Sequence, residues 1–382
     1  MNQIDMFEMF GIEHMKKIKS SDWKWTFSDY PTIQENALTC FSCFACGGGS
    51  TMGYKLAGVR VLGCIEIDKR MNDVYVKNHN PKYNYLMDIR EFNEIPDDEI
   101  PAELFNLDIL DGSPPCTTFS MNGLREETWG KLKKFREGQK EQTLDDLSFV
   151  FIETVNKLRP KTVIMENVEG ILLGDAWSYV QKIYQQMNEI GYKLAHFLIK
   201  GEQCGIPQKR HRVFFIGVRN DIDFDPAFLD MSFNYEPIPF GDVKTGKGKE
   251  INKQTNTFRI LSMATPNDKA FDSVYERIGE KSRQFSHRIV WNSDIMNTIA
   301  AKNDIYRGEE KTRLSIDDVI HCQTFPEDYD FIERKLDNVF YICGMSVPPV
   351  MIKRIVQRLI DQGLYKYKLE DQKNEKDQRN DS

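Results

Sequence analysis

The chain has 382 residues, 40% of them hydrophobic, so it can bury a sizeable core and form two domains. Its eight cysteines are too sparse for a disulfide scaffold, and no uninterrupted run of about 18 apolar residues would cross a membrane. Residues 1–20 carry several charged side chains without the apolar core of a signal sequence. We therefore expect a globular, cytoplasmic protein without a membrane partner.

The net charge of −7 conceals an uneven distribution along the chain. Residues 91–108 contain seven acidic side chains and no basic one, whereas residues 241–291 contain ten Lys or Arg against six Asp or Glu. Gly, Asn, Thr and Ser lie between the basic residues of the second stretch. A solvated loop region and a cationic face for a nucleic acid both fit this pattern.

The predicted elements alternate between strands and helices from residue 38 to residue 218. A β-loop-α-β unit comes first, and the later apolar runs alternate with helical patterns. This order predicts an α/β fold with an open, mostly parallel, Rossmann-like sheet covered on both faces. The strands are expected at 38–45, 59–67, 107–110, 162–165, 196–199 and 212–218, and the helices at 51–57, 145–158 and 176–190.

The periodic pattern degrades after Asn220. Residues 221–310 are rich in polar and turn residues, which indicates a second, smaller and irregular domain. Periodicity returns at Ile316 and in a predicted helix over 350–364. Residues 366–382 are almost all polar or charged, so we expect a disordered tail there.

A glycine-rich turn, Cys46 to Ser50, separates the first strand from the first helix. Such a turn lets backbone approach a ligand closely, and Glu66 follows 17 residues after Gly49, at the end of the second strand, where an acid can bind both hydroxyls of a ribose. Met52 occupies the last place of the dinucleotide pattern, so a nucleoside cofactor without a pyrophosphate suits the loop better. A turn that serves only helix-strand packing remains an alternative.

Asp88 follows a short apolar pair and could end a third strand, where its carboxylate would reach an adenine amino group. A helix cap or a surface carboxylate explains the same local sequence equally well.

Three cysteines, Cys40, Cys43 and Cys46, have a spacing that can hold an iron-sulfur cluster. Residues 40 and 43 are an odd number apart, so in a strand their side chains point to opposite faces. The strand pattern therefore disfavours a cluster. The other cysteines show no paired spacing, and we expect Cys64, Cys204, Cys322 and Cys343 to be small buried hydrophobes.

Residues 108–120 form an apolar run that stops at Pro114 and Pro115 and then presents Cys116. Two prolines fix the backbone and withhold two donors, so the chain must form a rigid loop there. A thiol on such a loop is placed as a nucleophile would be, although a structural loop cysteine is the alternative.

Two further groups of polar residues follow or begin predicted strands. Glu166 and Asn167 come directly after a buried strand, at the edge where open α/β sheets bind ligands, so Glu166 is either a proton donor or a paired structural acid. Gln208, Arg210 and Arg212 alternate at the start of another strand and so share one face. Two arginines on one face favour anionic or carbonyl-rich partners.

Taken in order, these motifs closely resemble those of the cytosine-C5 DNA methyltransferases, from about residue 38 to 362. Each motif is weak or moderate, but five in this order are highly specific. The matching segments are Phe44 to Gly49, Pro114 to Cys116, Glu166 to Val168, Gln208 to Arg212 and Gly344 to Pro348, and Arg313 to Pro326 resembles a further segment of the family.

The resemblance implies transfer of a methyl group from S-adenosylmethionine to C5 of a cytosine flipped out of duplex DNA, with no metal. Cytosine C5 is a weak nucleophile, so the Cys116 thiolate would first add at C6 while Glu166 donates a proton at N3. Arg212 would hold the exocyclic oxygen, and Arg210 would help position the nucleophile and the backbone. The implied catalytic residues are Cys116, Glu166, Arg210, Arg212, Pro115 and Asn167.

The resemblance also implies a set of cofactor-binding residues. Phe44, Gly48 and Gly49 would surround the methionine part, Glu66 would bind the ribose, Ile67 would lie against the adenine, Asp88 would meet its amino group, and Ser346 would lie near the carboxylate. The chain departs from the family at Cys46, where a glycine is usual, at Met345, where an asparagine is usual, and at Thr117, where a glutamine is common. None of these changes removes a reacting group.

The implied organisation is a discontinuous catalytic and cofactor-binding domain, residues 38–220 and 335–365. An N-terminal extension covers 1–37, a target-recognition domain 221–334 and a tail 366–382. Double-stranded DNA is the expected partner, a cognate restriction endonuclease is a candidate partner, and we expect a monomer. Arg259, Lys281, Arg283 and Arg288 are candidate contacts to bases or phosphates.

Two other functions remain open from the sequence. An RNA cytosine methyltransferase would use the same scaffold, although the long 221–310 stretch suits a reader of duplex DNA better. A DNA-binding regulator that kept the fold without the chemistry is the second alternative, against which the intact Cys116, Glu166 and both arginines argue.

Overall fold

The computed structural model describes residues 17–115, 147–282, 287–302 and 304–368. A seven-stranded sheet forms the body of the molecule, with strand order β3-β2-β1-β4-β5-β8-β6. The strands are β1 (Thr39–Cys43), β2 (Arg60–Glu66), β3 (Tyr83–Leu86), β4 (Ile109–Gly112), β5 (Thr162–Val168), β6 (Tyr192–Lys200) and β8 (His211–Arg219).

Strands β1 to β5 pair in parallel, and β8 runs antiparallel between β5 and β6. The expected open, mostly parallel α/β sheet is therefore confirmed. Two strands are longer than the sequence predicted. Strand β6 begins at Tyr192 rather than at 196, and β5 continues to Val168 rather than ending at 165. The added residues of both strands pair with β8. The backbone hydrogen bonds of this long antiparallel ladder extend the strands beyond the apolar residues from which they were predicted.

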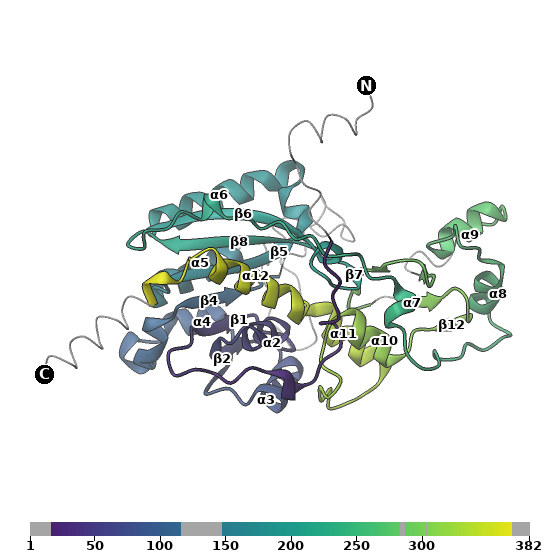
Figure 1. Cartoon of the computed structure of the whole chain (residues 1–382), viewed down its shortest axis with the longest axis horizontal. Coiled ribbons are helices and arrows are strands. Elements are labelled where there is room, and N and C mark those ends of the chain that lie inside the picture. The colour runs from purple at the N-terminus through teal and green to yellow at the C-terminus, as the bar shows by residue number, and fades with distance from the viewer. Residues whose placement is uncertain (1–16, 116–146, 283–286, 303, 369–382) are drawn as a thin grey trace, which may run out of the picture.

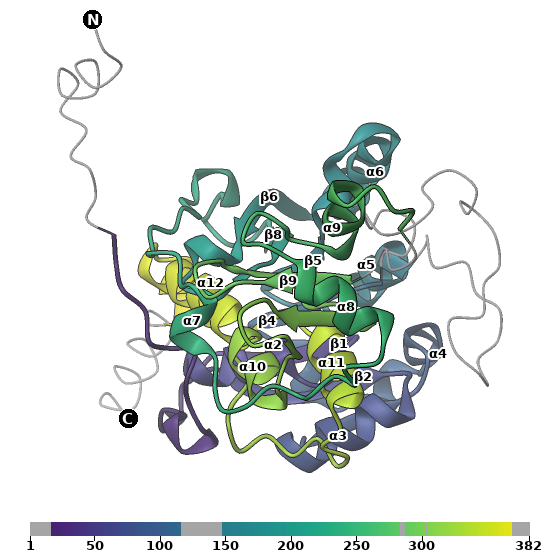
Figure 2. The same cartoon turned by 90° about the vertical axis from the view of Figure 1, so that its right-hand side faces the viewer.

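Helices cover both faces of the sheet (Figures 1 and 2). On one face, α2 (Gly49–Leu56) and α12 (Pro349–Asp361) share an apolar cluster with Cys40 and Ile164. On the other, α5 (Leu147–Leu158) and α6 (Trp177–Glu189) share a second cluster with Cys43 and Val163. Cys40 and Cys43 thus face opposite sides of β1, as the strand pattern predicted, which excludes a cluster held by both thiols. The helices α3 (Lys69–His79) and α4 (Ile89–Glu94) follow β2 and β3.

Residues 221–334 form smaller elements beside the sheet, with α8 and α9 at the end of the molecule distant from it (Figure 1). Their own apolar cluster includes Phe271, Ile289 and Trp291. The region is more regular than its composition predicted, because its short strands pair with one another and with β7 (Gln208–Lys209). It contains α7 (Phe240–Val243), α8 (Asn256–Met263), α9 (Phe271–Arg277), β9 (His287–Val290), β10 (Met296–Asn297), β11 (Asp304–Arg307), β12 (Thr312–Arg313) and α10 (Ile316–Cys322).

A three-stranded sheet, β12-β11-β9, lies within this region. Two contacts connect the region to the body. In the first, β10 pairs with β7, which directly precedes β8. Helix α11 (Leu336–Met345) packs in an apolar cluster that joins residues of α10 to Met52 of α2. Residues 221–334 are therefore attached to the sheet at β7 and around α11.

One stretch among the described residues, Leu336–Asp361, is apolar and long enough to cross a membrane by length and composition alone. It comprises α11 and α12, which are separated by Ser346 to Pro348, and 72% of its most apolar window is buried inside the protein. Packing in the core accounts for that composition.

The end of the described chain corrects the predicted tail. Tyr367 and Lys368 both contact the buried carboxylate of Asp108, and the Lys368 Nζ lies 2.6 Å from its Oδ2. Residues 366–368 therefore belong to the folded body, because Lys368 forms an ion pair with Asp108 and Tyr367 donates a hydrogen bond to it. Residues 369–382 lie outside the described residues.

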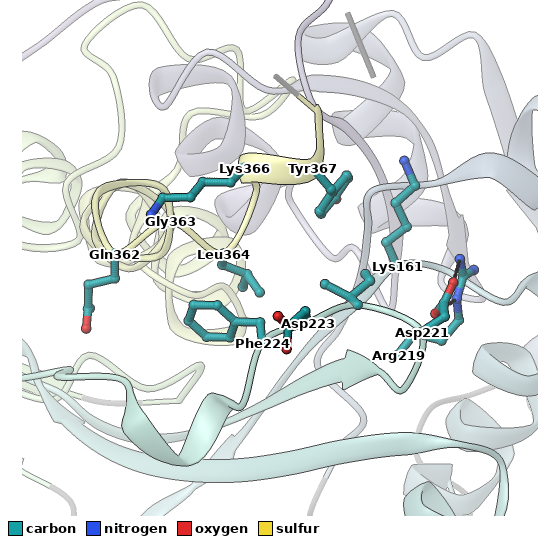
Figure 3. Close-up of a pocket in the computed structure, with 11 residues that line it drawn as sticks. Lys161, Arg219, Asp221, Asp223, Phe224, Gln362, Gly363, Leu364, Lys366 and Tyr367 are labelled. Carbon is teal, nitrogen blue, oxygen red and sulfur yellow. Dashed lines mark hydrogen bonds and ion pairs between the residues drawn. The ribbon is translucent and has the colours of Figure 1, made fainter. Parts of the chain in front are cut away.

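A cavity of about 600 Å³ lies near this point, at the edge where the parallel strands begin (Figure 3). Arg219, in its wall, forms an ion pair with Asp221, and Lys161 forms one with Asp108. These two cations are therefore already paired with acids of the same chain. Its other lining residues include Asp223, Phe224 and Tyr367.

Candidate active site

The strand register brings the predicted motifs to one edge of the sheet. Gly112 of β4 pairs with Cys43 of β1 on one side and with Met165 of β5 on the other, and Cys43 also pairs with Ile65 of β2. The chain leaves all four strands just beyond these residues. Because parallel strands end at the same edge, the glycine loop, the Pro114-Pro115 turn, Glu66 and Glu166 lie next to one another along it.

The predicted nucleophile, Cys116, lies outside the described residues. Its predecessor Pro115 is half-buried, and Pro114 is buried, directly after β4. The polypeptide thus enters the Cys116 segment from the edge that carries the other motifs. Gly112 is needed for this path, since a Cβ there would lie 2.4 Å from the Phe151 ring of α5.

Glu166 and Arg212 face each other across the antiparallel pair β5 and β8. The Arg212 Nε lies 2.7 Å from the Glu166 Oε1, and both side chains are mostly buried. The neighbouring Asn167 accepts a hydrogen bond from the Val168 N–H, but its buried Nδ2 has no acceptor among the described residues. A buried amide donor without a partner is costly, so this group is available to a loop or a ligand at the same edge.

Arg210 is buried and turned toward two backbone carbonyls. Its Nη1 donates to Ile299 O at 2.9 Å and its Nη2 to Gly344 O at 3.1 Å, while its Nε has no partner among the described residues. Burial and, to a smaller extent, the nearby Arg212 lower the pKa of Arg210 to about 9, while Glu166 opposes the shift. The guanidinium therefore stays charged at neutral pH and holds two segments together.

The glycine loop uses several left-handed backbone conformations. Phe44, Cys46 and Gly48 have φ values of 57°, 47° and 80°. At Gly48 a side chain is excluded, because its Cβ would lie 2.0 Å from the Nε2 of His79. At Cys46, where the family that the motifs resemble usually has glycine, the chain carries a side chain in a conformation that favours glycine. Such strain is commonly found where a loop must meet a ligand.

The acid at the end of β2 holds the loop in shape. Glu66 is buried, its Oε2 accepts from Cys46 N at 2.8 Å, and its Oε1 accepts from Asp68 N at 2.8 Å. The next residue, Ile67, is 40% exposed, and Leu86 at the end of β3 is 42% exposed. Two exposed apolar side chains on adjacent strand ends form a surface on which a flat base could lie.

Asp88 is a helix cap. Its Oδ1 accepts from Arg90 N at 2.9 Å at the start of α4, and its carboxylate also lies 3.4 Å from the Arg90 guanidinium. One of the two alternatives that the sequence left open is thus observed. Asp88 nevertheless stands at the same edge, after β3, where the adenine contact was expected.

Ser346 lies behind the glycine loop. It is buried, its Oγ donates to Ile342 O at 2.8 Å, and this Oγ is 3.3 Å from the position of a Cβ on Gly47. A Cβ on Gly49 would lie 2.1 Å from Val347 O. The glycines are therefore required for contact between the loop and the segment that precedes α12.

The residues at this edge fit a nucleoside cofactor. The loop offers the start of α2, Glu66 offers an acid beside it, and Ile67 offers exposed apolar surface. The phosphate-binding pattern is absent from the sequence, and α2 begins at Gly49 without a basic residue in its first turn. The site thus suits an adenosine carrying an amino acid group rather than a pyrophosphate.

Comparison with known proteins decides the family. The model of C-5 cytosine-specific DNA methylases matches residues 38–361. The chain belongs to this family. It is thus a DNA cytosine methyltransferase whose methyl donor is S-adenosylmethionine, and the resemblance seen in the motifs is confirmed.

Individual relatives agree with this assignment. The chain is 26% identical over 355 residues to the type II methyltransferase M.FnuDI of Fusobacterium nucleatum, covering 85% of this chain and 96% of that protein. It is 24% identical to M1.HphI of Haemophilus parahaemolyticus, covering 85% and 87%. Its fold is similar to that of a triple mutant of DNMT2 from Spodoptera frugiperda, with a TM-score of 0.59, 14% identity, and coverage of 85% of this chain and all of that chain.

The basic residues of the 221–310 stretch differ in their surroundings. Arg259 is held by both oxygens of Glu280, at 2.9 and 2.7 Å. Lys281 is exposed, and Arg288 is half-buried in β9. Arg283 lies outside the described residues. Of the three candidates within the described residues, Arg259 is therefore the least available for a nucleic-acid contact.

Sequence reasoning missed two polar groups close to the site. Asp111 is buried in β4, where Ser42 Oγ and Tyr54 Oη donate to it at 2.6 and 3.0 Å, and burial raises its pKa to about 7. Gln323 is buried between Gln208 and Ser346. Asp111 carried a signal, an acid inside an apolar strand. Gln323 lies in the 313–326 segment, whose resemblance to the family implied no role for this residue.

Proposed function

We propose that this enzyme methylates C5 of a cytosine flipped out of a specific duplex DNA sequence, and that Cys116 bonds transiently to C6 of that base. The observation that supports the proposal is the shared edge: β4, which leads to Pro114 and Pro115, pairs with β1, which leads to the glycine loop, and with β5, which carries Glu166. The reaction needs these three parts within reach of one base.

The chemistry follows from the weak nucleophilicity of cytosine C5. Addition of the Cys116 thiolate forms an S–C6 bond and pushes electrons toward C5, while a proton from Glu166 reaches N3. S-adenosylmethionine, when bound, supplies the methyl group. Loss of the C5 proton, breakage of the S–C6 bond and return of the N3 proton to the Glu166 carboxylate then restore the aromatic ring, the acid and the free thiolate.

Each neighbouring side chain has a proposed role in holding the base. Arg212, fixed by its ion pair with Glu166, would donate to the exocyclic oxygen. The unpartnered Nδ2 of Asn167 would bind the segment that follows Pro115, and so fix the thiol. Arg210 would act through the backbone that it holds, at Ile299 and Gly344.

The cofactor residues are proposed in the roles that the family implies. Glu66 would bind the ribose, Ile67 would support the adenine, and Asp88 would reach its amino group from the cap of α4. The left-handed loop with Phe44, Gly48 and Gly49 would surround the methionine part, and Ser346, directly behind the loop, would lie near its carboxylate.

We further propose that residues 221–334 read the target sequence, because they form an attachment beside the substrate edge with an apolar cluster of their own. Residues 38–220 and 335–365 would then form the catalytic and cofactor-binding domain. Duplex DNA is the substrate, and a monomer in the cytoplasm is the working form. A cognate restriction endonuclease is proposed as a partner, as the type II names of the relatives suggest.

A covalent trap tests the proposal. Methylation mapping of DNA from cells that express the protein first gives the target motif. A duplex with 5-fluorocytosine at that position should then form a stable adduct in the presence of S-adenosylmethionine, because fluorine cannot leave as the proton does. Cys116→Ser should abolish the adduct, since a serine hydroxyl is a far weaker nucleophile.

The controls separate the alternatives. Cys64→Ser, at a buried thiol of β2, should leave the adduct intact. Adduct formation on transfer RNA but not on the duplex would favour the RNA enzyme. DNA binding without an adduct or methyl transfer would favour the regulator.

A further inference from the structure

Two buried glutamines connect the proposed target-recognition region to the cofactor loop. Ile299 N donates to Gln208 Oε1 at 2.9 Å, Gln208 Nε2 donates to Gln323 Oε1 at 2.8 Å, and Gln323 Nε2 donates to Ser346 O at 2.7 Å. Both glutamines are 0% exposed. The three hydrogen bonds therefore form one continuous chain out of contact with water.

The direction of this chain is fixed by its ends. A backbone N–H such as that of Ile299 can only donate, and a carbonyl such as that of Ser346 can only accept. Each amide between them must present its oxygen to one side and its nitrogen to the other. Bonds aligned in this way polarise one another, and a break at either amide leaves a buried group without a partner.

The first end lies in the proposed target-recognition region. Ile299 follows β10, which pairs in parallel with β7, so Met296 lies opposite Gln208. The Ile299 carbonyl accepts from Arg210, so the two backbone groups of this residue are held by two side chains of the segment that leads into β8. Any shift of residues 296–301 on binding DNA would act directly on these bonds.

The second end lies against the cofactor loop. Ser346 Cβ is 3.0 Å from the position of a Cβ on Gly49, and its Oγ is 3.3 Å from that of Gly47. Gly344 packs still more closely against Ala300, whose carbonyl carbon would lie 2.4 Å from a Cβ on that glycine. Close packing leaves no room for either segment to move alone.

We infer that Gln323 is a positioning residue that couples occupation of the target-recognition region to the shape of the cofactor loop. The inference rests on the proposed function, because it assigns DNA binding to residues 221–334. Correct placement of the 296–301 segment aligns Gln208, which aligns Gln323, which holds the Ser346 carbonyl behind Gly47 and Gly49. The enzyme then binds its cofactor more tightly when its target DNA is bound, and it binds the target DNA more tightly when the cofactor is bound.

The coupling is measurable as a ratio of dissociation constants. The probes are S-adenosylhomocysteine and a duplex that carries the motif found by methylation mapping, both at equilibrium. For the wild-type protein, the duplex should lower the dissociation constant of S-adenosylhomocysteine by about five-fold or more. S-adenosylhomocysteine should lower the dissociation constant of the duplex by the same factor.

Gln323→Met tests the residue itself. Methionine keeps the length of glutamine but neither donates nor accepts, so the ratio should fall below about two-fold even if each separate affinity changes little. Gln208→Met breaks the same chain at its other amide and should give the same loss, which keeps the test valid if the first variant folds poorly.

A matched control removes one buried hydrogen bond elsewhere. Tyr192→Phe deletes the bond from Tyr192 Oη to Pro160 O, 2.5 Å long, at the opposite edge of the sheet. It should retain the wild-type ratio although it loses comparable stability. Loss of the ratio in this variant too would mean that general destabilisation, not the glutamine chain, sets the coupling, and would overturn the inference.

The remaining outcomes are also decisive. A Gln323→Met protein with the wild-type ratio overturns the inference, as does a wild-type ratio near one, while methyl transfer to the mapped motif leaves the proposed function standing. A wild-type protein that transfers no methyl group to DNA overturns the proposed function itself, and the inference with it.

Discussion

At the edge where the parallel strands begin, Asp108 is enclosed by Lys161, Lys368, Tyr367 and the Thr39 backbone. At the edge where they end, Asn167 and Arg210 keep buried nitrogens without a partner in the described part of the chain, and Ile67 exposes apolar surface. The first edge satisfies its polar groups within the chain, so it contributes stability. The second leaves groups available for binding, which is a typical arrangement at a functional site.

Asp108 and Asp111, three residues apart in the chain, show the same difference between the two edges. Burial alone would raise the pKa of Asp108, but its bonds with Lys368, Thr39 and Lys161 outweigh burial and lower it. Asp111 has only the Ser42 and Tyr54 hydroxyls to oppose burial, and the charge of Glu166 adds to it, so its pKa rises to about 7. The local supply of cations, rather than burial, decides which acid stays ionised.

The largest effect is expected at the binding edge. Glu166→Gln should lower kcat by about 10²- to 10⁴-fold, because glutamine keeps the shape but cannot donate the proton. Methyl transfer from labelled S-adenosylmethionine to the mapped duplex measures this. Asp108→Asn, at the other edge, should keep kcat per folded molecule within about two-fold. A Glu166→Gln enzyme with near wild-type kcat would remove the acid from the mechanism.

The glycine loop should come next. Gly48→Ala should weaken S-adenosylhomocysteine binding by about ten-fold or more, since the new methyl group would collide with His79 and displace the loop. Isothermal titration measures the loss. Gly279→Ala is the matched control, because Gly279 has a similar φ of 73° with nothing within 4 Å of a Cβ. Equal weakening by both variants would attribute the effect to backbone strain alone.

At the edge where the strands begin, Asp108→Asn should lower the free energy of unfolding by about 1–3 kcal/mol at neutral pH. The folded-state pKa of Asp108 is lowered, so its stabilisation is present above the unfolded value of 3.8 and is lost as the pH falls through the folded value. The deficit of the variant should therefore shrink in acid. Urea unfolding at about pH 7 and about pH 2 checks this, and a deficit independent of pH would contradict the ion-pair explanation.

The smallest effect is expected at Asp111, with the opposite sign. Its folded-state pKa is raised from 3.8 to about 7, so the stability contributed by the protonated acid is present in full below 3.8 and is lost as the pH rises to about 7. Asp111→Asn should gain about 1 kcal/mol relative to the wild type between about pH 6 and about pH 7. Unfolding curves at both values measure it. Parallel stability curves for the two proteins would show that Asp111 does not titrate in this range.

Much of the body could be predicted because its signals are local. Apolar runs such as 162–165 and the glycine turn at 46–50 mark strand ends without knowledge of their neighbours, and five motifs in order identified the family. The extra residues of β5 and β6 were not predicted, because their hydrogen bonds with β8 depend on the partner strand and leave no pattern in their own sequence. The paired strands of 221–334 escaped for the same reason.

The amino-acid sequence by itself determined which residues can react or bind: a cysteine after two prolines, an acid after a buried strand, arginines in alternation and a glycine turn. Only the tertiary structure decided that Glu166 pairs with Arg212, that Arg210 is buried against Ile299 and Gly344, and that Gln208 and Gln323 join two distant segments. The physical reason is that residue type fixes what a group can donate, accept or carry as charge. Its partner and its burial depend on strand register and packing between segments far apart in the chain.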